Sequence, residues 1–138
     1  MSRTLALLDA VDALYTGAVT EPERWGERAL QDWAEDLATS GPLDREEAKA
    51  VRACLRNAGR LRDFWSGPAP AVPADDWQAR VDVAMGPRAW RPTLDLAIAG
   101  LEAHPSPELF DEVKRRFRIV ESQHWMDDIT YEEWLAGR

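Results

Sequence analysis

Apolar residues recur about every three or four positions along most of the chain, which is the period of an α-helix with one buried side. The clearest case is the segment from Asp44 to Trp65, where Val51, Cys54 and Leu61 share one side. At about 100° per residue, the basic side chains form one stripe on the other side. They are Arg45, Lys49, Arg52, Arg56 and Arg60. The segment is therefore predicted to be an amphipathic helix with a basic outer face.

The same period predicts two helices before this central one. Ser2 is a candidate cap for the first, which we expect to end near Gly17. Its buried side would be Leu7, Leu8, Val11, Leu14 and Tyr15. Thr20 and Glu23 have capping-box spacing with Pro22 in the first turn, which predicts the start of a second helix. The inward residues of that helix would be Leu30, Trp33, Ala34 and Leu37.

A proline-rich stretch, residues 67–75, has no helical period and predicts an extended crossover. Asp75 or Asp76 is a candidate cap for a short helix that ends at Met85. Within it, apolar residues alternate as in a strand, but a helix is favoured because no second strand could pair with it; these residues are Ala79, Val81, Val83 and Met85. Another helix is predicted from Pro92 or Thr93 to His104. The next begins at Ser106 and buries Phe110, Val113, Phe117 and Val120. Thr130 and Glu133 predict a last short turn.

The expected fold class is therefore all-α, a compact bundle of about six helices in a single domain, residues 1–138. Residues 1–66 would form an N-terminal three-helix half, 67–75 the linker, and 76–138 a C-terminal three-helix half.

The charge balance is acidic, with a net charge of −8 and a pI near 4.8. Such a surface repels phosphate, which makes nucleic acid and anionic membranes unlikely partners. The single cysteine, Cys54, excludes an intrachain disulfide, and no apolar run approaches the length of a membrane span. We expect a cytoplasmic protein, and 15 Arg against 2 Lys with abundant Ala suggests a GC-rich bacterial genome.

The segment 121–135 is acidic and aromatic, and it could complement the basic stripe either within one chain or between two chains. Its candidate apolar anchors are Trp125, Met126 and Trp134, because tryptophan is enriched at the energetic centres of interfaces. The competing interpretation is that most of the seven tryptophans seal a small core.

Two weaker patterns involve His124. Glu121 and His124 have the E-x-x-H spacing of carboxylate metal sites, although only one such motif is present. Arg118 and His124 have a spacing that resembles that of HEPN-type ribonucleases, which are also small and all-α. The resemblance would imply that this pair acts on an RNA phosphodiester, usually in a site shared across a dimer.

No motif specifies a reaction or a cofactor. The sequence therefore predicts a non-catalytic protein–protein interaction module: an adaptor, an immunity or antitoxin-like partner, or a regulatory subunit. Its partner would be another protein or a second copy of the chain. The alternatives are a HEPN-like ribonuclease and a structural subunit of a larger assembly.

Overall fold

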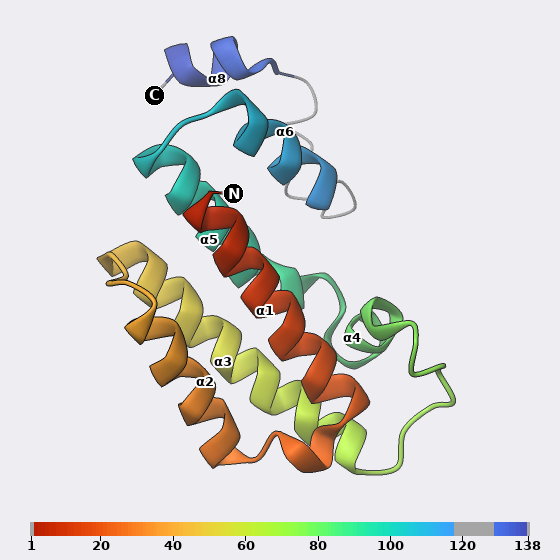
Figure 1. The fold of residues 1–138 in the computed structure, drawn as a ribbon. Helices are drawn as coiled ribbons and strands as arrows, with labels where there is room; N and C mark the ends of the chain where they lie inside the picture. Colours follow the sequence, from red (N-terminus) through yellow and green to blue (C-terminus); the bar gives the residue numbers. More distant parts are fainter. Residues whose placement is uncertain (1, 118–128, 138) are drawn as a thin grey trace.

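The computed structural model describes residues 2–117 and 129–137, and every regular element within these ranges is helical. The α-helices are α1 (Arg3–Thr20), α2 (Glu27–Thr39), α3 (Arg45–Ser66), α4 (Trp77–Met85), α5 (Arg91–Ala103), α6 (Pro107–Arg116) and α8 (Tyr131–Ala136) (Figure 1). Two 3₁₀ turns, η1 (Pro22–Arg24) and η2 (Gly86–Trp90), precede α2 and α5. The protein is all-α, and the predicted compact bundle of about six helices with a short terminal one is confirmed.

Helix α1 is the central element of this bundle. It crosses the middle of the molecule in Figure 1, and it packs against α3, α4 and α5. Its predicted buried side is confirmed and extends further along the helix, through Leu7, Leu8, Val11, Leu14, Tyr15, Ala18 and Val19. Because α3 precedes the crossover and α4 and α5 follow it, helices from both halves of the sequence share one core.

Side-chain caps fix several of the helix starts. At the start of α3, Asp44 accepts a hydrogen bond from the Glu47 amide (2.8 Å), and the Glu47 carboxylate accepts one from the Asp44 amide (3.0 Å). Thr130 and Glu133 form the same reciprocal pair at α8. The start signal predicted at Thr130 and Glu133 is confirmed, and both capping boxes satisfy amides that have no partner inside the helix. Single caps at three other helices come from Ser2, Asp76 and Ser106.

The predicted boundary between the first two helices is wrong. Helix α1 continues past Gly17 and ends at Thr20, whose hydroxyl donates to the carbonyl oxygen of Thr16 (2.6 Å) instead of capping a second helix. The residues expected to open that helix form η1, and α2 begins at Glu27. The reason is Trp25, whose indole lies against Gly17; a Cβ there would be 2.1 Å from its Nε1. Gly17 is a packing site within α1 and does not end it.

The proline-rich crossover, residues 67–75, contains no helix, as predicted, and Arg80 of α4 ties it to the bundle. The guanidinium donates to the carbonyl of Val19 at the end of α1 (2.7 Å) and twice to that of Val72 in the crossover (3.0 and 2.8 Å). It also lies 4.6 Å from the ring centroid of Trp65. One side chain thus joins α1, the C-terminal end of α3 and the crossover.

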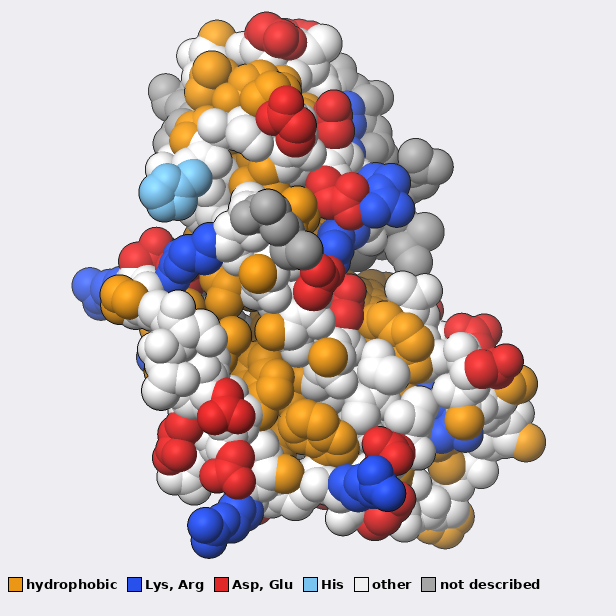
Figure 2. Space-filling view, in the orientation of Figure 1, with side chains coloured by type: hydrophobic (Ala, Val, Ile, Leu, Met, Phe, Trp, Pro, Cys, Tyr) orange, Lys and Arg blue, Asp and Glu red, His pale blue; other side chains and the backbone are white. Residues whose placement is uncertain are grey.

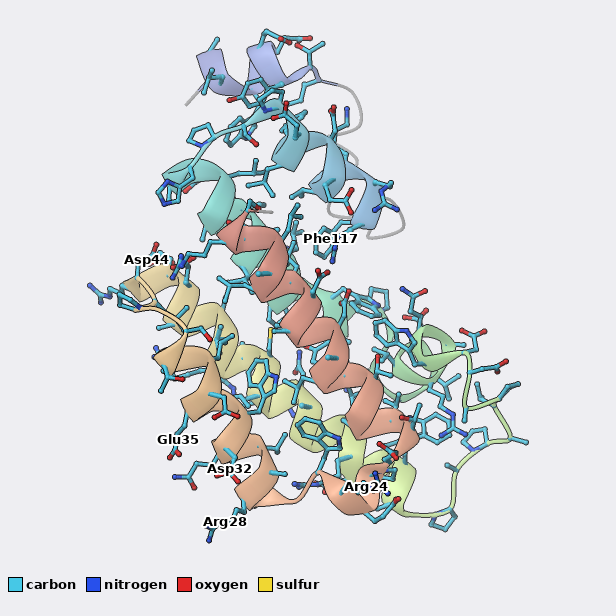
Figure 3. The ribbon with its side chains drawn as sticks, in the orientation of Figure 1. Arg24, Arg28, Asp32, Glu35, Asp44 and Phe117 are labelled. Carbon is cyan, nitrogen blue, oxygen red and sulfur yellow. The ribbon has the colours of Figure 1, made fainter. Side chains whose placement is uncertain are left out.

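Helix α6 is joined to α1 by Arg116. Its guanidinium contacts the carboxylates of Asp9 (2.6 Å), Asp12 (3.3 Å) and Glu112 (3.0 Å). Burial raises the pKa of Asp12 to about 6, although Arg116 opposes the shift. The helix predicted to start at Ser106 is shorter than expected, because α6 ends at Arg116. The residue that caps this end, Phe117, is buried and lies between α6 and α1 in Figure 3. The expected position of Val120 lies outside the described residues.

Candidate functional site

The basic stripe predicted on the central helix is present on α3 and forms a continuous exposed ridge. All five of its side chains, Arg45, Lys49, Arg52, Arg56 and Arg60, are exposed. The opposite side of α3 is buried against α1 and α5 through Val51, Cys54, Ala58 and Leu61. We call these five cations the basic ridge. None of them makes a hydrogen bond or ion pair with another residue in the described ranges, so no direct partner holds any of these side chains within this part of the chain.

A groove runs along each side of the basic ridge. The first, between α2 and α3, has a volume of about 530 Å³ and an apolar floor of Leu30, Leu55 and Gly59. The second, between α3 and α5, has a volume of about 360 Å³ and a floor of Ala50, Ala53 and Ala99. Arg56 borders both grooves, which places a cation between two concave surfaces.

Carboxylates border the basic ridge on both sides. Glu27 and Asp63 line the first groove. Arg62, at the end of that groove, contacts both of them, and the hydrogen bond to Asp63 raises the pKa of Arg62 above its ordinary value. On the other side, the lining includes Glu46, Asp95 and Glu102. The arrangement suits a partner that presents a narrow row of negative charge, because a broader anionic surface would meet these carboxylates.

The described part of the acidic aromatic segment, residues 129–135, packs elsewhere in the molecule. The ring of Trp134 in α8 lies 5.7 Å from that of Phe110 in α6, and Lys114 of α6 donates to the carbonyl of Ile129 (3.2 Å). The described part of this segment therefore packs on α6, at the end of the molecule shown uppermost in Figure 1, and does not cover the ridge of α3. The other residues predicted to act there lie outside the described residues: Arg118, Glu121, His124, Trp125 and Met126.

Six of the seven tryptophans are described, and each is partly buried against the hydrophobic core. They are Trp25, Trp33, Trp65, Trp77, Trp90 and Trp134. This agrees with the interpretation in which large rings close the margins of a small core. Figure 2 shows one consequence, an apolar strip at the surface between α1 and α2. Charged residues of α2, including Arg28, Asp32 and Glu35, point outward beside it in Figure 3.

Two candidate kinds of reactive group, a cysteine thiol and a metal-binding cluster, can be checked among the described residues. Cys54 is fully buried, and burial raises the pKa of its thiol to about 11, which disfavours the reactive thiolate at neutral pH. Within residues 2–117 and 129–137, no group of three or more His, Cys, Asp or Glu side chains is placed to hold a metal ion. None of the described helices is both long enough and apolar enough to cross a membrane.

Comparison with known proteins adds no relative: no protein-family model matches the chain, and neither do curated proteins or solved structures. The basic ridge itself could be predicted from helical periodicity, because all five residues belong to one helix. The two grooves could not, since they depend on where α2 and α5 pack.

Proposed function

We propose that the protein is a non-catalytic interaction module that binds an acidic partner protein through the basic ridge of α3. The roles that fit are those of an adaptor, an immunity or antitoxin-like partner, or a regulatory subunit. The acidic aromatic C-terminal segment is a second proposed contact. In its described part, Leu135 is a large apolar side chain that a partner can reach, since it is 42% exposed, while Trp134 is engaged with Phe110.

The observation that carries this proposal is the set of five exposed cations on one helix, none with a direct ion-pair partner among the described residues, in a chain whose net charge is −8. Placing like charges in a row along a helix is unfavourable without a counterpart, since neighbours at i,i+4 repel each other. An acidic partner would relieve this repulsion, and the positive charge of the ridge would attract the partner to it. The bordering carboxylates disfavour a duplex nucleic acid, whose phosphates extend beyond a single row.

The test begins with the tagged protein purified from its native host and any stoichiometric protein partner identified in the preparation. The partner's dissociation constant is then measured for the wild type and for the double variant Arg52→Glu, Arg56→Glu. We expect binding to weaken about 10- to 100-fold, because two attractive contacts become repulsive. The matched control is Arg28→Glu, Arg88→Glu, which changes net charge equally at exposed positions away from the ridge.

The proposal predicts that the control variant binds within about threefold of wild type at 0.15 M salt, where distant charges are largely screened. Equal weakening in both variants would show a net-charge effect only. Unchanged binding in the ridge variant, with an unchanged circular dichroism spectrum, would remove the ridge from the interface. Recovery of RNA in place of a protein partner would contradict the proposal.

A further inference from the structure

Gly59 lies in the interior of α3, the longest described helix, and no packing contact explains it. Glycine destabilises a helix interior relative to alanine, because it loses more backbone freedom on folding. Gly17 and Gly100 also lie inside helices, but a Cβ at either would come within 2.1 Å of Trp25 or Thr4. At Gly59 the nearest atoms, on Arg62 and Leu30, are 4.0 Å from a Cβ position. The backbone there is also ordinary, since its φ is not positive.

The missing side chain keeps the first groove open. Gly59 lies on the floor of the 530 Å³ groove between α2 and α3, beside Leu30 and Leu55. The ridge cations Arg56 and Arg60 form one wall of this groove and lack partners among the described residues. They are four residues apart, so they stand about 6 Å apart along the helix axis. A concave apolar floor therefore lies directly beside two unpaired cations.

We propose that this groove receives an apolar side chain from an acidic helix of the partner protein, and that Gly59 determines what enters. Carboxylates one helical turn apart on the partner pair with Arg56 and Arg60, and the apolar residue between them rests on the floor. This inference rests on the proposed function and specifies the ligand: an acidic segment that carries an apolar residue at the right spacing. A purely electrostatic surface would accept acidic segments without one.

The test uses a displayed library of sixteen-residue peptides selected on the full-length protein. We expect enrichment of peptides with acidic residues four positions apart around an apolar residue. One enriched peptide is then synthesised with a fluorescent label, and its affinity is measured by anisotropy for wild type, Gly59→Ala, Gly59→Leu and Ala53→Leu. Ala53 lies on the floor of the second groove, so the last variant fills the wrong groove on the same helix.

Gly59→Leu is expected to weaken binding about 10- to 100-fold, the effect of excluding one buried apolar side chain. Gly59→Ala is expected to weaken binding about three- to tenfold, because its methyl group takes part of the space in the groove, whereas Ala53→Leu is expected to stay within about threefold of wild type. Thermal unfolding checks that each variant folds. If Gly59→Leu does not fold, Gly59→Ala still tests the groove. If folded Gly59→Ala and Gly59→Leu both bind the peptide as tightly as wild type, the missing side chain at Gly59 does not determine what enters the groove.

Two failures can be told apart. If the peptide binds Gly59→Leu as well as wild type but loses affinity for Arg52→Glu, Arg56→Glu, the groove is wrong and the ridge remains. If selection yields no acidic peptides, or a sixteen-nucleotide poly-uridine RNA binds more tightly than any peptide, both the groove and the proposed function are overturned.

Discussion

Replacing Arg80 by alanine tests how the crossover is held to the bundle. The side chain donates to the carbonyls of Val19 and Val72, with the second carbonyl accepting two of its hydrogen bonds. Because the two hydrogen bonds to Val72 share one acceptor, we count them as one. This leaves two charge-assisted hydrogen bonds of about 1.5 kcal/mol each. The contact with the Trp65 ring adds about 0.5–1 kcal/mol. We therefore expect Arg80→Ala to lower the free energy of unfolding by about 3.5–4 kcal/mol.

The assay is urea unfolding followed by circular dichroism, with limited proteolysis of residues 67–75 as a local readout. Arg80→Lys should recover less than half of the loss, because an ammonium lacks the planar fork that reaches both carbonyls. The control is Arg91→Ala, whose ion pair with Asp95 is mostly exposed (64% and 54%) and should be worth at most about 0.5 kcal/mol. The reasoning is refuted if Arg80→Ala lies within 1 kcal/mol of wild type, or if Arg80→Lys matches wild type.

Three further predictions concern stability and can be measured by the same urea unfolding. Gly17→Ala should lower the free energy of unfolding by about 1–3 kcal/mol, because the new Cβ meets the Trp25 ring. Gly59→Ala should raise the free energy of unfolding by about 0.5–1 kcal/mol, because a Cβ there meets no close neighbour. Changes of the same sign in the two variants would contradict this reasoning. Arg3→Met should lower the free energy of unfolding by about 2 kcal/mol, because the carboxylate of Glu47, which is 2% exposed, loses the guanidinium 2.6 Å away. An unchanged free energy of unfolding would mean that the capping hydrogen bonds alone stabilise the buried carboxylate. The pKa of Asp12 is raised from 3.8 to about 6 on folding, so its contribution is favourable at low pH and is lost as pH rises through 6. The stability of Asp12→Asn relative to wild type should therefore increase from pH 4 to pH 7, and a constant difference would exclude Asp12 as the source.

Much of the fold could be predicted because the signals were local. The capping box of Asp44 and Glu47 involves residues three apart, and the buried stripe of α1 follows from helical period alone. At α4 the local alternation resembles a strand, and the helix was favoured, correctly, because no second strand could pair with it. The α1–α2 boundary was wrong because Gly17 resembles a helix end until Trp25 is placed against it. Contacts between residues distant in sequence leave no periodic signal.

The candidate site divides in the same way. The five cations of the basic ridge were predicted from one helix, and their exposure is confirmed. The groove at Gly59 has walls on two helices, and the packing of α6 against α8 removes Trp134 from any contact with the ridge. Both depend on tertiary geometry. The unexplained glycine in α3 was the only local signal that could have pointed to the groove.

The central position of α1 also has a consequence for synthesis on the ribosome. This helix is made first, yet its partners α3, α4 and α5 emerge later, with α5 ending at Ala103. At typical translation speeds of about 5–20 residues per second, the interval from Thr20 to Ala103 lasts roughly 4–17 s. Throughout it, the apolar side of α1 lacks its full cover, and exposed apolar surface of this kind favours aggregation and chaperone binding until α5 has been synthesised.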